Sequence, residues 1–316
     1  MSVAAEAHRA VAALAQATSP PPVAQAAEVT SLVEKIDALP TIPIIAQRVG
    51  ELVNDPRADV QSVARALRTD QSLTAKVLKL ANSSYYSIPG GVTDVTRAVS
   101  FLGFNTLYQL VLSISVLSVL DGRGAQAVKP RELWRHSAAV AALAESLARR
   151  LRYAEPEACF TGGLLHDIGK VALLQVAPHD FERASMCAKD LQISLRDAEQ
   201  RMGLPDHEDV GTRLAQRWRF PMALRVAIGH SRYLQPGEAR ASLAPQLAAL
   251  ADITALANAI ARRMHIGDSG DVLVPELDPD LLKRLNLTAL AIEACRDDFL
   301  RAVERSKVLM ALFEEP

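Results

Sequence analysis

Aromatic residues are scarce in this chain, at 4% of its 316 residues. The core must therefore be built from Ala, Leu, Val and Ile, a composition that favours helix. Glycine (15) and proline (17) are too few for a collagen-like or generally disordered chain. The three cysteines, Cys159, Cys187 and Cys295, lie far apart without C-x-x-C spacing. This argues against a disulfide framework or a cysteine zinc site and indicates buried thiols in a reducing compartment.

The chain also lacks an excess of either charge. Its 35 Lys and Arg nearly cancel its 36 Asp and Glu, which gives a formal net charge of -1. A broad basic field for nucleic acid or anionic lipid is therefore absent, and we expect neither nucleic acid nor membrane as a partner. The length suggests about two domains.

Two segments resemble targeting or membrane sequences. No basic region precedes the N-terminal apolar stretch, and Glu6, His8 and Arg9 interrupt it, so a signal peptide is not expected. Residues 1–28 instead predict a flexible Ala/Pro-rich N-terminus. Residues 101–120 carry no charge and are long enough to span a membrane, but polar residues interrupt them and no basic cluster or aromatic belt flanks them. We therefore expect a buried core helix in a cytoplasmic protein.

From about residue 28 onward the apolar residues recur at spacings of three and four, which predicts helices. Asp59 and Asp70 are the expected N-caps of two of them. Further helices are expected over residues 94–102, 104–120, 131–151, 155–175, 181–202, 207–217, 221–230, 244–264 and 279–312. Because no run of alternating apolar and polar residues predicts a strand, the expected fold class is all-α.

Glycine and proline mark the expected boundaries between domains. The stretch Gly122-Arg123-Gly124 and the pair Lys129-Pro130 separate two helical parts. We expect an N-terminal helical lobe over residues 29–125, a helical bundle over residues 126–264 and C-terminal helices over residues 265–316, with a loop over residues 265–279.

The sharpest local feature is His166-Asp167, which lies within the apolar run GGLLHDIGK. Burying a carboxylate without a partner costs several kcal/mol. A divalent cation is one partner that suits both side chains. A His that bonds a neighbouring Asp satisfies both groups without a metal, so ligation and packing both stay open. A second pair, His179-Asp180, lies beside a proline, where we expect a solvated turn.

Other ionisable residues lie on predicted helices with apolar faces, and bundles build metal sites from such residues. These are His136, His207, His230 and Asp252. His207 also suits a helix N-terminal turn, and His230 suits a helix C-terminus because of the helix dipole. Lys170, one turn after the His-Asp pair, is either a phosphate contact or a solvated surface lysine.

Tyr85 and Tyr86 follow Asn82 and Ser83 in a segment rich in turn-forming residues. They either form a partner-binding edge or pack between the two lobes with their hydroxyls hydrogen-bonded. Packing is the favoured interpretation.

The order His136, His166-Asp167 and Asp252 resembles the HD superfamily of metal-dependent phosphohydrolases. From about residue 30 to 232 the chain is similar to one branch, the HDOD domain proteins of bacterial signalling, and residues 244–264 fit the helix that supplies the last Asp. The supporting motifs are LPTIP (39–43), DQSLTAKVLKLANS (70–83), AVSFLG (98–103), GLLHDIGK (163–170), HEDVGTRLA (207–215) and WRFP (218–221).

The resemblance implies a regulatory, non-catalytic protein, in a family whose members often lack the metal ligands. This chain keeps candidates at all the usual positions. By position, one metal would be held by His136, His166, Asp167 and Asp252, and a second by His207 and His230 with Asp167 bridging. Imidazole and carboxylate suit iron, manganese, zinc or nickel. The Gly-Tyr-Pro signature of the related HD-GYP phosphodiesterases is missing, and Ser231 follows His230 where a second His would be expected.

The sequence therefore predicts a cytoplasmic regulatory protein that binds protein partners or a small phosphorylated ligand, with one or two metal ions as a structural or ligand-sensing element. The alternative is a metal-dependent phosphodiesterase or phosphohydrolase. In that case the metal would lower the pKa of bound water to about 7. Asp167 would bridge the ions, and Lys170 would offset charge that develops on the phosphate.

Overall fold

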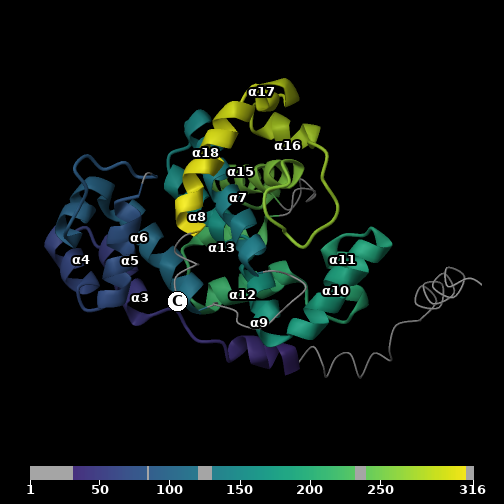
Figure 1. Ribbon diagram of the computed structural model, residues 1–316, viewed down its shortest axis with the longest axis horizontal. Helices are drawn as coiled ribbons and strands as arrows, with labels where there is room; N and C mark the ends of the chain where they lie inside the picture. The colour runs from purple at the N-terminus through teal and green to yellow at the C-terminus, as the bar shows by residue number, and fades with distance from the viewer. Residues whose placement is uncertain (1–30, 84, 120–129, 232–239, 311–316) are drawn as a thin grey trace, which may run out of the picture.

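The computed structural model describes residues 31–83, 85–119, 130–231 and 240–310. Over these residues it is all-helical and contains no strand, which confirms the expected fold class. The expectations for residues 1–28 and for the boundary at residues 122–129 lie outside the described residues. Figure 1 shows the helices of residues 44–119 gathered at one side and the remaining helices packed into a larger bundle beside them.

A first helix over residues 31–37 lies against the bundle, where Asp37 pairs with Arg213, and the N-terminal lobe follows it. The helices of the lobe are α3 (Ile44–Val53), α4 (Val60–Leu67), α5 (Gln71–Ala81) and α6 (Val95–Val119). The predicted N-caps are confirmed. Asp59 accepts a hydrogen bond from the backbone N–H of Ser62 at 2.7 Å, and Asp70 accepts one from that of Leu73 at 2.9 Å. Each cap satisfies a backbone donor that the first helical turn leaves without a partner.

Helix α6 connects the lobe to the bundle. Gly103 has a φ of 77° and a ψ of 168°, so α6 consists of two helical segments, as the predicted ranges 94–102 and 104–120 require. By length and composition alone, the stretch Val95–Val116 could span a membrane, since its mean hydropathy is 1.4. Half of this stretch is buried inside the protein. Here it packs against α3, α4, α5 and α8, as expected for a core helix.

The bundle is built around α7 (Pro130–Arg150), which packs against α8, α15 and α18. Its other helices are α8 (Pro156–Leu165), α9 (Ile168–Val176), α10 (Pro178–Leu191), α11 (Leu195–Arg201), α12 (His207–Arg217), α13 (Met222–Gly229), α15 (Pro245–Arg263), α16 (Pro279–Arg284), α17 (Ala289–Glu293) and α18 (Arg296–Met310). Small side chains let these helices approach closely. A Cβ at Gly163 of α8 would lie 2.8 Å from the backbone of Ala141 on α7.

Three long predicted helices are divided in the structure. Residues 155–175 form α8 and α9, which meet at His166-Asp167. Residues 181–202 form α10 and α11, because Gln192 ends α10 in the left-handed conformation. Residues 279–312 form α16, α17 and α18. The predicted loop at 265–279 is confirmed up to Pro279, where α16 begins. The first division matters for function, because it removes the His-Asp pair from the regular helix.

Helices α9 and α12 touch through glycine. A Cβ on Gly169 would lie 1.8 Å from the carbonyl oxygen of His207 and 2.7 Å from the backbone nitrogen of Gly211. Both neighbours are backbone atoms, which cannot rotate away. This contact therefore sets the distance between the His-Asp junction and the start of α12.

We expect Gly169→Ala to lower the free energy of unfolding by about 3 kcal/mol, because the added methyl group must separate two backbones. The matched control is Gly229→Ala, whose Cβ meets only the side chain of Thr212 at 2.8 Å. Urea unfolding of the two variants checks the expectation. Equal stability of the two would contradict the close approach of α9 and α12.

Candidate metal centre and cleft

The His-Asp pair lies where α8 ends and α9 begins. His166 and Asp167 expose only 1% and 3% of their surface. The Nδ1 of His166 lies 2.7 Å from the carbonyl oxygen of Gly163, which only accepts, so Nδ1 carries the proton. Nε2 is then left as the acceptor. It is buried without a hydrogen-bond partner, although Asp167 Oδ2 lies 3.2 Å away. A ring nitrogen fixed and oriented in this way is typical of a metal ligand.

A second imidazole, from α7, faces the pair. The rings of His136 and His166 have centroids 5.5 Å apart, and donor atoms of His136, His166 and Asp167 all lie within 4.8 Å of one another. Burial and the neighbouring His166 lower the pKa of His136 to about 3, so its ring is neutral near pH 7. Neutral imidazole is the form that binds metal ions. His136, His166 and Asp167 are therefore brought together as predicted.

Lys170 supplies a cation to this group from within the chain. Its Nζ donates to Asp167 Oδ2 at 2.8 Å and to the carbonyl oxygen of Ser269 at 2.9 Å, and only 3% of the lysine is exposed. Burial opposes ionisation of Asp167, but His166 and Lys170 outweigh it and hold the pKa of Asp167 well below its usual value. Lys170 is thus neither a solvated surface lysine nor, in this structure, a free phosphate contact.

Asp252 requires a correction, because its carboxylate binds two arginines instead of joining this group. Oδ1 accepts from Arg240 Nε at 3.0 Å, and Oδ2 accepts from Arg284 Nε at 2.7 Å. Asn258 occupies the place beside the imidazole, with Oδ1 at 3.1 Å from His136 Nε2. The physical reason is helical phase: six residues turn an α-helix by about 600° and advance it by about 9 Å. Asp252 and Asn258 therefore point to different neighbours.

His207 is held by a carboxylate that the sequence interpretation missed. Its Nδ1 lies 2.8 Å and 2.9 Å from the two carboxylate oxygens of Glu199, which is fully buried. Burial alone would lower the pKa of His207, but Glu199 outweighs it, so the pKa is raised. With Asp206 these residues form a second group of three potential ligands. His207 also lines the same cleft as Asp167.

The remaining expected ligand of a second ion is His230, which caps the C-terminus of α13. Its carbonyl oxygen accepts a hydrogen bond from Arg240 at 2.9 Å. Within the described residues His230 belongs to neither group of potential ligands. His179, of the other His-Asp pair, is exposed as expected, although it lies in the first turn of α10 and not in a separate turn.

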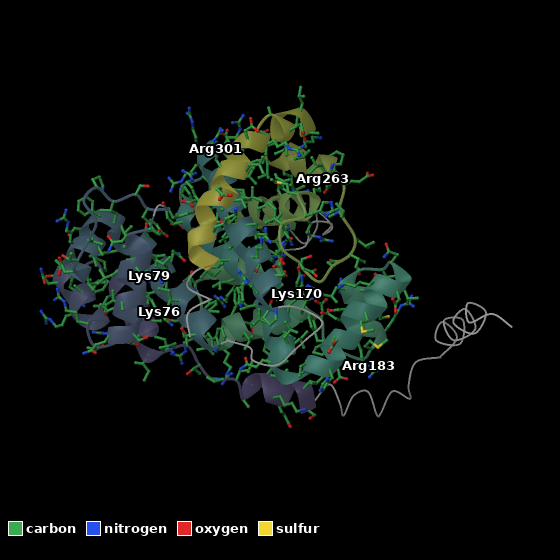
Figure 2. The ribbon with its side chains drawn as sticks, viewed as in Figure 1. Lys76, Lys79, Lys170, Arg183, Arg263 and Arg301 are labelled. Atoms are coloured by element: carbon green, nitrogen blue, oxygen red, sulfur yellow. The ribbon has the colours of Figure 1, made fainter. Side chains whose placement is uncertain are left out.

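A cleft of about 770 Å³ opens beside the metal centre, with Asp167, Lys170 and Asn258 among its lining residues. Its lining includes the segment at residues 271–279, and Figure 2 shows Lys170 in the middle of the bundle. The charged lining residues are the carboxylates Asp167, Asp197, Glu208, Asp271, Glu276 and Asp278 and the cations Lys170, Arg196 and Arg262. Each of these cations is paired with a carboxylate. The excess of acid favours a cation in the cleft over an anion.

The donor set fits one divalent ion. Two imidazoles and one carboxylate converge, and one of the imidazole nitrogens has no hydrogen-bond partner. A bound ion would compete with Lys170 for Asp167. The six residues expected to hold two ions are not assembled at one point, since Asp252 pairs with Arg240 and Arg284. The sequence did not indicate a role at the site for Asn258, Glu199, Arg240 or Arg284. Each is only a polar residue on or beside a helix, without a motif around it.

Comparisons with known proteins agree with this fold. A model of the HDOD domain matches residues 39–233. An uncharacterized protein from Treponema pallidum (strain Nichols) is 24% identical over 195 residues, which are 60% of this chain but 37% of that protein, so the chain spans little more than a third of this relative's length.

Two solved structures are similar over most of their length. An HDOD domain protein of unknown function from Geobacter sulfurreducens is 25% identical, with a TM-score of 0.72 over 89% of this chain and 98% of the other. A protein from Shewanella amazonensis SB2B that is provisionally named a phosphohydrolase is 25% identical, with a TM-score of 0.64 over 88% and 97%.

We expect Lys170→Met to lower the free energy of unfolding by about 3–5 kcal/mol, because it leaves the buried Asp167 carboxylate without its cation. Adding Asp167→Asn should recover part of that loss, since the double variant buries no unpaired charge. The control is Lys189→Met at an exposed position of α10. Urea unfolding of all four proteins measures the effect. A Lys170→Met variant as stable as Lys189→Met would contradict the role of the pair.

Glu199→Gln should destabilise the protein in a pH-dependent way. Because the pKa of His207 is raised in the folded state, the stabilisation by Glu199 is fully present below about pH 6.5 and declines as the pH rises through the raised value. The difference in unfolding free energy between wild type and variant should therefore be larger at about pH 6 than at about pH 9. The control is Glu51→Gln, whose carboxylate pairs with Arg48 on the surface. A difference that does not change with pH would refute the ion pair.

Proposed function

Because this chain belongs to the HDOD family, we propose that it is a regulatory protein of bacterial signal transduction that acts by binding a protein partner and does not hydrolyse a phosphoester. The observation that carries the proposal is the buried ion pair between Asp167 and Lys170, at 2.8 Å. The carboxylate that would bridge two metal ions in a hydrolase is neutralised here by the chain's own ammonium group.

The surroundings of the pair support a non-catalytic role. Three ligand atoms converge, from His136, His166 and Asp167, where hydrolysis with two ions needs about twice as many. Asp252 cannot move to the centre without giving up its ion pairs with Arg240 and Arg284. Loss of a partner in a buried ion pair costs about 3–5 kcal/mol. Asp252 is therefore not available as a ligand beside Asp167, and the second group of potential ligands, Glu199, Asp206 and His207, does not include Asp167.

The character of the cleft favours a protein partner over the small phosphorylated ligand that the sequence also allowed. Its lining carries more carboxylates than cations, which repels phosphate. Leu273 and Val274 lie at this cleft and are 41% and 48% exposed. Neighbouring exposed apolar side chains beside a polar cleft are typical of protein interaction sites. We therefore place the partner-binding surface at the segment around residues 271–279.

A divalent metal ion remains part of the proposal as a structural or ligand-sensing element. His136, His166 and Asp167 would hold it, and the ion would supply Lewis acidity to a bound group. Among the expected metals, two imidazoles and one carboxylate suit iron, and the set is compatible with manganese, zinc or nickel. We also propose a cytoplasmic location, which the three free cysteines favour.

The second candidate function is a metal-dependent phosphohydrolase. The acceptor nitrogen of His166, buried without a hydrogen-bond partner, favours it, because such an atom in a group of ligands suits a metal ion. The name of the Shewanella protein points to the same activity. Here Asp167 would bind the ion, and Lys170 would have to leave Asp167 before it could contact a phosphate.

A turnover experiment separates the two functions. Protein purified without chelator or histidine tag is analysed for metals and then assayed, with Mn²⁺ or Fe²⁺ added, on cyclic dinucleotides, nucleotides and bis(p-nitrophenyl) phosphate. We expect no turnover above that of His166→Ala. The matched control is His179→Ala, from the exposed His-Asp pair. Turnover that His179→Ala keeps but His166→Ala and Asp167→Asn lose would establish the hydrolase instead.

The partner surface has its own test. A photo-crosslinking amino acid replaces Leu273 in living cells, and the same amino acid replaces Leu290 as a control, because Leu290 is 80% exposed on α17, away from the cleft lining. We expect a discrete adduct of higher mass from position 273 alone. Identical adduct patterns from both positions would refute a specific surface at the cleft.

A further inference from the structure

A second pocket lies between the two lobes, and it shares no lining residue with the cleft of the metal centre. It has a volume of about 320 Å³. Tyr85 and Tyr86 line it from the segment between α5 and α6, Gln109 from α6, Glu145 from α7 and Phe160 from α8. In Figure 1, α6 lies between the other N-terminal helices and the bundle. Both tyrosines pack against the core and the hydroxyl of Tyr85 is hydrogen-bonded to Glu145, as the favoured interpretation expected, and a pocket lies beside them.

Aromatic rings are concentrated in this pocket. The chain is only 4% aromatic, yet Tyr85, Tyr86, Phe101 and Phe160 all line the same cavity. The ring centroid of Tyr85 lies 5.0 Å from that of Tyr86 in an edge-on arrangement and 5.3 Å from that of Phe160. The rings pack against one another and together form the aromatic part of the pocket wall. Their faces carry partial negative charge, which attracts cations.

The polar lining has more negative than positive charge. Arg149 donates to Glu145 at 2.6 Å and to Glu157 at 3.2 Å, so one guanidinium faces two carboxylates. Tyr85 also donates its hydroxyl hydrogen to Glu145. Burial raises the pKa of the Glu145 carboxyl in spite of Arg149, with Glu157 adding to the effect. Arg305 also acts on Glu145 from outside the pocket lining, and within the lining two carboxylates face one cation, Arg149.

One hydrogen-bond acceptor in the pocket has no donor. The side-chain oxygen of Gln109 is buried, and the described part of the chain offers it no hydrogen-bond partner. A buried acceptor without a donor costs about 1–3 kcal/mol. A ligand that brings an N–H or O–H group would remove this cost.

We propose that this pocket binds a small organic cation with an alkylammonium group. The ammonium group lies against the rings of Tyr85, Tyr86 and Phe160 and balances the charge of Glu145 and Glu157. A hydroxyl or N–H group of the same ligand donates to Gln109. Anions are excluded by the two carboxylates, and neutral apolar molecules gain contact with the rings but no charge compensation.

The ligand would contact both lobes. Tyr85, Tyr86 and Gln109 belong to the N-terminal lobe, and Glu145 and Phe160 belong to the bundle. A ligand that contacts both lobes stabilises the arrangement of the lobes in which the pocket exists over arrangements in which it does not. The proposal is independent of the metal centre and of the proposed regulatory function.

The test compares choline with 3,3-dimethylbutan-1-ol, a neutral molecule of the same shape, by saturation-transfer NMR titration of the full chain. We expect choline to bind at least about tenfold more tightly, as a cation–π contact with charge compensation provides. Equal affinity for both molecules would show an apolar pocket and overturn the proposal. If choline at about 20 mM shows no saturation transfer, the proposed cation site is overturned as well.

Variants locate the binding. Glu157→Gln should weaken choline about fivefold and leave the alcohol unchanged, while Tyr86→Leu should weaken both. Glu51→Gln, at a surface pair on α3, should bind choline as wild type does. Circular dichroism confirms that each variant is folded. Choline affinity unchanged in Glu157→Gln would place the site elsewhere and refute the assignment.

Discussion

The buried ion pair between Asp167 and Lys170 is the interaction on which the functional centre depends. Taking a carboxylate out of water is costly unless a cation and hydrogen bonds replace the solvent. Lys170 supplies both, and its third role is architectural, because its ammonium group also donates to the carbonyl oxygen of Ser269. This hydrogen bond attaches the loop between α15 and α16 to the start of α9. The lysine that neutralises Asp167 therefore also positions the loop that lines one side of the cleft.

Close backbone packing places the other groups around this pair. The glycine contact between α9 and α12 brings the start of α12, and with it His207, next to the His-Asp junction. The fully buried Glu199 then holds His207 through both carboxylate oxygens. Each imidazole near the cleft thus has one ring nitrogen held by a neighbouring group, as in a metal site, while the chain itself provides the charge that a metal would supply.

The two pockets place different chemistry on the two sides of one scaffold. The cleft at the metal centre is acidic and flanked by the apolar pair Leu273 and Val274, which suits a polypeptide partner. The pocket between the lobes is aromatic and lined by Glu145 and Glu157, which suits a small cation. The two proposed sites share no lining residue, and coupling between ligands requires two such distinct sites.

The amino-acid sequence alone determined the all-helical fold, the caps at Asp59 and Asp70 and the break at Gly103, because each depends on residues within about one helical turn. The HDOD family and the grouping of His136 with His166-Asp167 also followed from motif order. Only the tertiary structure decided that Asn258 and not Asp252 faces His136, and that Lys170 neutralises Asp167. His136 and Asn258 are 122 positions apart, and although Lys170 lies only three positions from Asp167, it is buried there by a contact with Ser269, 99 positions away. Helical periodicity shows which residues share a face, but the rotation of one packed helix against another is set by side-chain volumes throughout the core.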